Sequence, residues 1–413
     1  MSAPAEYKAY PIYQDSGIEW FGAIPQAWDT SLGKWLFEEI ADRGHVNEPL
    51  LSVTQATGVL PRDASEIQVW NPGEDVSGYK LVLPDDFVIS LRSFQGGIEH
   101  SACRGIISPA YTVLRPTQEI NPGYFRYLLK SGPVISALNA VTTGIRQGKN
   151  ISFDNFGSLP YIVPPRQEQR AIAKFLDSET GKIDGLVAKK KRLIELLQEK
   201  RTALIKEAVT KGLDPKVEMK DSGVEWLGEI PAHWGVVRLK RAVLFQRGHD
   251  LPSEVREAGS VPIISSAGPL ATHSEARARG PGIVTGRYGT IGKFHLVEED
   301  YWPLNTTLYS IEMYANEPRY LTYVLTSLSD LFLMYSLKSA VPGVDRNDIH
   351  TIPVAIAPLE EQQRIAVYLD DRMAEISALI VRIEDAVHTL NELRSALVSS
   401  AVTGKIDVRE EPA

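Results

Sequence analysis

The chain has 413 residues, of which 43% are hydrophobic and 23% charged, and its formal net charge is −8. This length exceeds one compact core and predicts two or three domains. The composition excludes a disordered or collagen-like chain, and no apolar stretch approaches the ~18 residues of a membrane span. The single cysteine, Cys103, excludes internal disulfides and thiolate zinc clusters. The first residues do not resemble a secretory signal, so we expect a cytoplasmic protein. Its acidity argues against coating nucleic acid by bulk attraction.

A short motif occurs twice along the chain. Residues 15–28 read DSGIEWFGAIPQAW and residues 221–234 read DSGVEWLGEIPAHW, with nine of fourteen positions identical. A longer repeat follows each variable block, because residues 165–214 match residues 358–407 at a constant shift of 193. Eighteen of those fifty positions are identical. A period of this length indicates a duplication of whole units and not a solenoid.

Both long repeats predict helices. Apolar residues recur in alternating steps of four and three over about five heptads, which is typical of a coiled-coil seam. The net charge of residues 166–214 is +4 and that of residues 359–407 is −4. Because opposite charges attract, the two helices should pair within one chain. The predicted seam consists of Ile172, Leu176, Ile183, Leu186, Leu193, Leu197, Leu204, Ile365, Leu369, Ile376, Leu379, Ile383, Leu390 and Leu397.

Topology favours an antiparallel helix pair, which would put the two variable blocks at opposite ends. The short motif at residues 15–28 would then lie where the second long helix finishes, just as residues 221–234 follow the first one. This predicts a pseudo-twofold, nearly circular arrangement.

The variable blocks predict a mixed α/β (α+β) fold. Residues 81–91, 111–116 and 283–297 have the alternation and turns of strands, whereas residues 124–138 and 319–337 have the pattern of helices. Polar loops between them carry arginine, glutamine, asparagine and serine, which are side chains that read base edges, while glycine permits close approach to phosphate. Such loops also occur on many proteins that bind no nucleic acid.

No catalytic constellation is found in the sequence. It lacks H-E-x-x-H, G-x-S-x-G and Walker A motifs, and no H-x-x-x-H pair indicates a metal site. Residues 121–124, NPGY, favour a turn before a helix over a methyltransferase motif, and Cys103 is interpreted as a packed thiol. We therefore expect a non-catalytic chain with no catalytic, cofactor-binding or metal-ligating residues.

The duplicated motifs resemble those of the specificity subunit (HsdS) of type I restriction–modification systems over essentially the whole chain. The matching features are the paired P-x-x-E-Q-x-x-I-A-x-[FY]-L-D starts at Pro165 and Pro358, the paired A-V-T ends, and the D-S-G-[IV]-E-W-x-G-x-I-P motifs. The resemblance implies two target recognition domains, each reading one half of a split double-stranded DNA sequence, separated by helices that dock two methyltransferase subunits. Restriction subunits would complete the enzyme, and S-adenosylmethionine, ATP and Mg²⁺ would bind those partners.

The resemblance implies five segments and places the polar loops on the presumed DNA face. Residues 1–164 hold the first recognition domain, 165–213 the central helix, 214–357 the second recognition domain, 358–407 the C-terminal helix and 408–413 a tail. The candidate DNA-binding residues are Gln55, Arg92, Ser93, Phe94, Gln95, Arg104, Arg146, Lys149, Arg247, His249, Ser265, His273, Arg287, Tyr288, Asn305 and Arg346.

Two alternatives to this interpretation remain open at this point. The chain could be a coiled-coil adaptor that joins two protein-binding domains without DNA, or an enzyme with an unrecognised site, such as a standalone nuclease. Under the DNA-reading interpretation, rigid helices would hold the two recognition domains at a fixed distance. The target would then have two specific parts separated by an unspecific spacer of fixed length.

Overall fold

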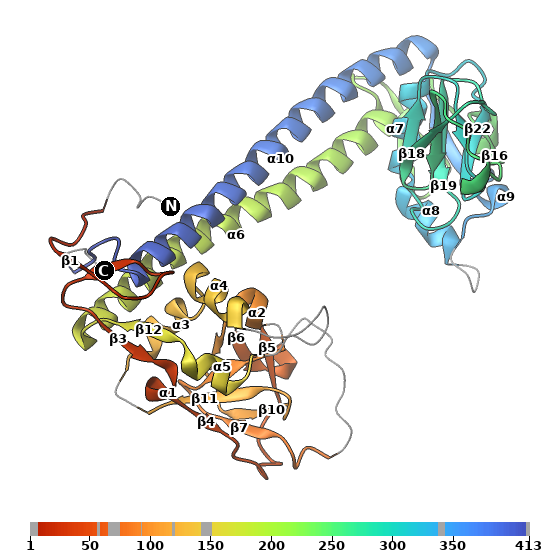
Figure 1. Ribbon diagram of the computed structural model, residues 1–413. Helices are drawn as coiled ribbons and strands as arrows, with labels where there is room; N and C mark the ends of the chain where they lie inside the picture. Colours follow the sequence, from red (N-terminus) through yellow and green to blue (C-terminus); the bar gives the residue numbers. More distant parts are fainter. Residues whose placement is uncertain are drawn as a thin grey trace. The chain divides into compact units, whose positions relative to one another are not determined.

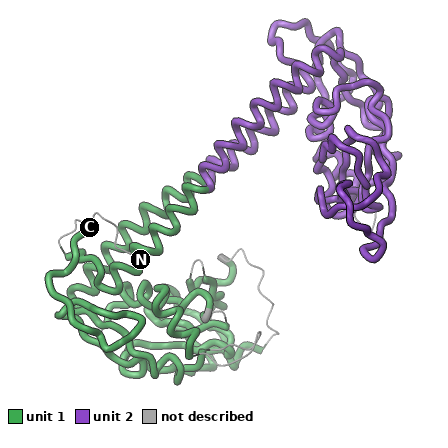
Figure 2. Tube along the Cα trace, turned by 45° about the horizontal axis from the view of Figure 1, so that its top comes forward, with its two compact units in different colours: residues 1–190, 385–413 green, residues 191–384 purple. Residues whose placement is uncertain are grey.

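We analysed a computed structural model of the protein, in which residues 7–55, 58–64, 75–91, 93–117, 120–141, 151–337 and 343–409 are described. The chain forms two compact units (Figure 2). Unit 1 contains residues 1–190 and 385–413, and unit 2 contains residues 191–384. The division passes through two long helices, α6 (Arg166–Lys211) and α10 (Leu359–Val402), so each helix contributes to both units.

The globular part of unit 1 is built around an antiparallel sheet with the strand order β4-β11-β8-β9, of which β4 and β11 are labelled in Figure 1. Its strands are short runs with buried apolar side chains, and the ring of Phe37 packs against Phe125 and Phe156 from the covering helices at centroid distances of 5.6 and 5.5 Å. The strands are β1 (Tyr13–Asp15), β2 (Ala23–Pro25), β3 (Asp29–Leu32), β4 (Phe37–Ile40), β5 (Leu51–Thr54), β6 (Gly58–Pro61), β7 (Lys80–Val82), β8 (Phe87–Ile89), β9 (Glu99–His100), β10 (Gly105–Ile107), β11 (Thr112–Pro116) and β12 (Pro160–Val163). The helices are α1 (Gly33–Leu36), α2 (Ser93–Gly96), α3 (Pro122–Leu128), α4 (Gly132–Val141) and α5 (Phe153–Ser158).

The globular part of unit 2 repeats this topology. A hairpin is followed by a strand that pairs with the last strand before the long helix, and between them lies an antiparallel sheet in the order β16-β22-β19-β20. The strands are β13 (Met219–Asp221), β14 (Glu229–Pro231), β15 (Gly235–Arg238), β16 (Leu244–Arg247), β17 (Val261–Ser265), β18 (Gly268–His273), β19 (Gly282–Gly286), β20 (Phe294–Val297), β21 (Trp302–Pro303), β22 (Thr307–Glu312) and β23 (Pro353–Ile356). The helices are α7 (Pro318–Ser327), α8 (Ser329–Ser336) and α9 (Arg346–Ile349).

The mixed α/β prediction is confirmed, although each predicted helix of the variable blocks is divided in two. The predicted helix at 124–138 becomes α3 and α4, and that at 319–337 becomes α7 and α8. In unit 1 the break precedes Pro133, whose ring removes a backbone donor and disfavours a helical conformation in the residue before it. Among the described residues, no helix is both long and apolar enough to cross a bilayer.

Within each unit, α6 and α10 pack antiparallel, as predicted. In unit 1, Ile172 and Leu176 from the start of α6 share a core with Ala401 from the end of α10. In unit 2, Ile205 near the end of α6 shares a core with Ile365 near the start of α10. Arg394 of α10 also donates to Asp184 of α6 in unit 1 at 2.9 Å, and this ion pair runs opposite to the net charges of the two helices.

The seam differs from the prediction at three positions. Leu186, Leu193 and Leu379 are 48%, 43% and 43% exposed. The adjacent residues Val187, Ile194 and Ile380 pack against the cores instead. Each site offers two consecutive apolar residues, and both choices preserve a seven-residue repeat, so the heptad pattern alone does not decide between them. The other predicted seam residues are buried or half-buried: Ile172, Leu176, Ile183, Leu197, Leu204, Ile365, Leu369, Ile376, Ile383, Leu390 and Leu397.

The two ends of the described chain meet within unit 1, as the circular arrangement predicts (Figure 1). The backbone N–H of Asp407 donates to the carbonyl of Lys8 at 2.7 Å, and the Tyr13 hydroxyl donates to the carbonyl of Gly404 at 3.0 Å. The short motif at residues 15–28 therefore lies beside the end of α10, just as the motif at 221–234 follows the end of α6.

Candidate nucleic-acid interface

Identical residues of the long repeats fasten each globular part to its helix in the same way. Glu168 accepts a hydrogen bond from the indole N–H of Trp28 at 2.7 Å, and Glu361 accepts one from Trp234 at 2.8 Å. Both tryptophans are fully buried, and a buried indole N–H requires an acceptor. The short motif and the long repeat are thus two halves of one structural joint.

A second joint is formed by Gln169 and Gln362, both buried. The Gln169 carboxamide accepts from the backbone N–H of Asn121 at 2.9 Å and donates to the carbonyl of Pro164 at 2.8 Å. Gln362 accepts from the N–H of Glu317 at 2.8 Å and donates to the carbonyl of Ala357 at 2.9 Å. In both units one side chain therefore satisfies backbone groups on two segments that flank the helix.

The third joint uses Asp177 and Asp370. Asp177 accepts from the Tyr127 hydroxyl at 2.7 Å and pairs with Arg126, which lies on α3. Asp370 accepts from the Tyr323 hydroxyl at 2.7 Å and pairs with Arg319 at 2.8 Å, both on α7. Burial is the main cause that raises the pKa of both tyrosines, so they remain neutral donors. The three joints hold the loops of each globular part in a fixed relation to its own segment of helix.

In unit 2 the ends of several strands converge into what we call the loop cluster: residues 247–250, 264–268, 286–289, 303–307 and 343–346. The N–H of Arg287 donates to Thr306 at 2.8 Å, and the carbonyl of Arg287 accepts from Val344 at 3.0 Å. The close approach requires glycine, because a Cβ on Gly248 would stand 2.1 Å from the carbonyl oxygen of Leu304. The backbones of distant segments are thereby locked together.

Three predicted arginines and an aromatic ring belong to this loop cluster. The side chain of Arg247 is 54% exposed, Arg346 is exposed at the start of α9, and Arg287 is half-exposed. The guanidinium of Arg287 lies 4.8 Å from the ring centroid of Tyr288, which is itself 38% exposed. Stacking limits the conformations of Arg287 while its donors remain available, as bidentate recognition of a guanine edge or a phosphate requires.

Four other predicted residues of unit 2 have structural partners instead. His273 is 5% exposed and accepts the N–H of Glu257 at 3.1 Å, so burial removes it from a contact surface. The Ser265 hydroxyl donates to the carbonyl of Gly268 at 2.9 Å and closes the β17–β18 turn. His249 contacts the Tyr309 hydroxyl at 3.2 Å. The Asn305 side chain donates to Asp250. The last three lie in the loop cluster, where they position its backbone.

In unit 1 the predicted residues are more dispersed. Gln95 is exposed on α2, and Gln55, at the β5–β6 turn, packs beside Gly96. Ser93 is wholly buried, and its hydroxyl accepts the N–H of Ser90, so this side chain has a structural partner. Arg104 is paired with Glu48 at 2.9 Å. Arg92, Arg146, Lys149 and the side chain of Phe94 lie outside the described residues.

Sequence reasoning missed Lys130, which organises this part of unit 1. Its ammonium donates to both carboxylate oxygens of the buried Glu99, at 2.9 and 2.7 Å, and to the carbonyl of Gln55 at 2.7 Å. Burial raises the pKa of Glu99, an effect that Lys130 opposes. No local motif indicates this pairing, because the partners are far apart in sequence.

The described residues contain no group of three or more histidine, cysteine, aspartate or glutamate side chains placed to hold a metal ion. Cys103 is half-buried and packs against a small apolar cluster.

Comparisons with known proteins agree with this description. The family model for the type I restriction modification DNA specificity domain matches residues 231–388. The putative type I restriction enzyme MjaX specificity subunit of Methanocaldococcus jannaschii is 22% identical, over 81% of each chain. The EcoKI specificity subunit of Escherichia coli K12 is 21% identical, over 82% of this chain and 78% of the relative.

Solved structures share the fold. A chain from a type I restriction–modification system studied for its assembly and conformational transition has a TM-score of 0.72 at 15% identity, covering 92% of this chain and 98% of that one. The HsdS subunit of Thermoanaerobacter tengcongensis has a TM-score of 0.52 at 16% identity, covering 93% and 98%. The family model thus covers part of the second half of the chain, and the relatives that align with about four fifths of the chain are specificity subunits of type I restriction enzymes. Residues 231–388 therefore match the type I restriction modification DNA specificity domain, and the chain as a whole is similar to HsdS specificity subunits.

Proposed function

We propose that the two units read two separate parts of one bipartite DNA target. The observation that carries this proposal is the duplicated construction: the same sheet order and the same three joints recur in both units, while the loop sequences differ. A constant frame with two different sets of loops suits a protein that presents two different sequence readers. The net charge of −8 is compatible with this role because the candidate contacts are local.

In unit 2 the reader is the loop cluster. Arg247 and Arg346 would neutralise phosphates and set the register on the duplex, whereas Arg287 would contact a base edge in the major groove. Backbone hydrogen bonds such as that from Arg287 to Thr306 fix the loops that carry these arginines before DNA binds, which lowers the ordering cost on association.

The long helices would dock two methyltransferase subunits. Leu186 and Leu379 occupy equivalent positions of the repeat, are identical, and are both exposed, one in each unit. Exposed apolar residues repeated in this way are typical of an interaction site. S-adenosylmethionine would bind the methyltransferases, and ATP with Mg²⁺ the restriction subunits, which is consistent with a chain that contributes only recognition.

The test is genome-wide mapping of methylated adenines in cells that carry the methyltransferase with this chain. Arg287→Ala should relax or abolish selection at one part of the target, at a cost of ~1–3 kcal/mol, and leave the other part unchanged. Arg238→Ala, an exposed arginine on β15 outside the loop cluster, is the matched control. Unaltered target selection by Arg287→Ala would remove this residue from the reader, and methylation independent of the chain would favour the adaptor alternative.

A further inference from the structure

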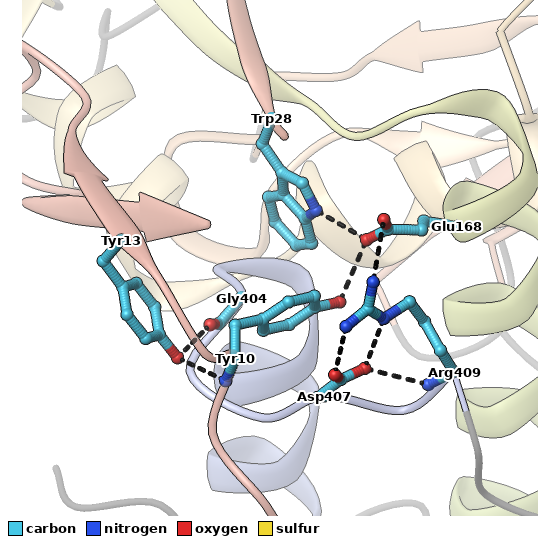
Figure 3. A network of polar contacts seen from close by, with 7 residues as sticks. All are labelled: Tyr10, Tyr13, Trp28, Glu168, Gly404, Asp407 and Arg409. Carbon is cyan, nitrogen blue, oxygen red and sulfur yellow. Dashed lines mark hydrogen bonds and ion pairs between the residues drawn. The ribbon is translucent and has the colours of Figure 1, made fainter. Parts of the chain in front are cut away.

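In unit 1 the joint around Glu168 is covered by the two ends of the chain (Figure 3). The Tyr10 hydroxyl donates to Glu168 at 3.1 Å, and the Tyr10 ring meets the Trp28 ring edge-on at 5.7 Å. Arg409 stacks over Tyr10 at 4.9 Å and is held by Asp407 at 2.6 Å. Burial and the nearby carboxylates raise the pKa of Tyr10, so it remains a neutral donor.

A second tyrosine of the same segment, Tyr7, covers the adjoining part of α6. Its ring lies edge-on to Phe175 at a centroid distance of 5.4 Å. Residues 7–10 therefore insert two aromatic side chains, three positions apart, into neighbouring sites on the beginning of the helix.

Unit 2 has the same framework without these covering side chains. Glu361 and Tyr368 stand at the positions equivalent to Glu168 and Phe175, and each borders a cavity. The two cavities adjoin, because both are lined by Gly212, Pro215 and Val217. In unit 2, residues 212–220 join the end of α6 directly to the short motif. In unit 1 the same region is formed by two separate segments, residues 7–10 and residues 407–409. The Glu361 carboxylate contacts His233 Nε2 at 2.6 Å, yet the Glu361 side chain is 25% exposed. The Glu168 side chain is only 12% exposed.

We propose that this double cavity of unit 2 binds a tyrosine-bearing, basic segment of a second protein, in the manner in which unit 1 binds its own residues 7–10. One tyrosine would donate its hydroxyl to Glu361, and the other would pack against Tyr368. The residues that line the cavities include four carboxylates and three basic side chains, Lys211, Arg364 and His233. This excess of negative charge favours a basic segment. The acidic residues are Glu207, Asp214, Glu229 and Glu361.

This inference goes beyond the proposed reading of DNA and does not depend on it. The site involves only the joint of unit 2 and none of the residues of the loop cluster. Loss of base selection by Arg287→Ala and loss of segment binding are therefore separate results.

The probe is a labelled synthetic peptide with the sequence of residues 7–13, YKAYPIY, titrated with the full-length chain and followed by fluorescence anisotropy. We expect saturable binding that Val217→Trp weakens at least ~10-fold, because the indole fills the shared wall of the cavities. Val255→Trp, at a residue 57% exposed elsewhere in unit 2, should bind as the wild type does. The peptide YKAFPIY should bind several-fold more weakly, because it lacks the hydroxyl for Glu361.

Three results would overturn the proposal. The first is the absence of saturable binding, and the second is equal affinity for the wild type and Val217→Trp, which would place the peptide elsewhere. The third is a dimer in light scattering that Val217→Trp dissociates, because the cavities would then be occupied by a second copy of the chain.

Discussion

Glu168 and Glu361 each bind a tryptophan that is more than a hundred residues away, and this single contact explains two repeats at once. The short motif supplies the indole, and the long repeat supplies the carboxylate. The duplication was evident from the sequence, but the purpose of the identical residues was not. A carboxylate at the start of a helix is common on exposed surfaces, so only the structure shows that it satisfies a buried donor.

Replacement of Gln362 tests the second joint at the level of one side chain. Gln362→Leu would leave the N–H of Glu317 and the carbonyl of Ala357 without their partner, so we expect a loss of about 2–3 kcal/mol in the stability of unit 2. Gln363→Leu, at the exposed neighbouring position, should change stability by less than about 0.5 kcal/mol. Chemical denaturation followed by tryptophan fluorescence measures both, and equal effects would refute the joint.

His350 should make unit 2 sensitive to acid. Its Nε2 accepts the N–H of Phe245 at 3.0 Å, which requires the neutral ring, and burial, aided by Arg346 and Lys240, lowers its pKa. A lowered pKa gives stability that is complete above the unfolded-state pKa of ~6.5 and is lost as the pH falls below it.

We therefore expect the wild type to lose more thermal stability between pH 7.5 and 5.5 than His350→Gln does. His388→Gln, at a side chain 77% exposed, should lose as much as the wild type. Thermal unfolding at the two pH values measures this difference. Identical losses in the wild type and His350→Gln would show that another group is responsible.

At the scale of elements, the sequence predicted the long helices and their antiparallel sense but not the inward-facing residue at every step. Leu186-Val187 and Leu193-Ile194 each offer two apolar neighbours, and packing against the partner helix selects the second. The shared topology of the two variable blocks was also not predicted from the sequence. Different sequences can form the same sheet, because the strands need only suitable buried residues while the loop residues are free to differ. Among the candidate DNA-binding residues, Arg247 and Arg346 are exposed, whereas His273 and Ser93 are buried, and the sequence could not predict this difference because burial is decided by contacts distant in sequence.

The exposed leucines of the helices lead to a prediction about assembly. Leu186→Arg and Leu379→Arg should each leave the fold intact and remove one of two bound methyltransferase subunits, and the double variant should remove both. Leu270→Arg, at a residue 54% exposed on β18, is the control. Native mass spectrometry of the purified complex reports the stoichiometry, and full assembly of the double variant would exclude these leucines from docking.

At the scale of the whole molecule, α6 and α10 each contribute to both units, which share one construction. α6 contains 46 residues, so at ~1.5 Å per residue it is about 69 Å long. If each unit reads its own part of the target, the number of unspecific base pairs between the parts is set by helix length, and the identity of the bases is set by the loops. These two properties should therefore change independently.

The most direct test inserts one heptad with matching apolar positions into both helices, after Lys190 in α6 and after Glu384 in α10, where the two units divide. Seven residues add ~10.5 Å of helix, which corresponds to about three base pairs. Mapping of methylated adenines should then reveal both specific sequences unchanged and a spacer about three base pairs longer. Altered specific sequences with the original spacer would contradict the account.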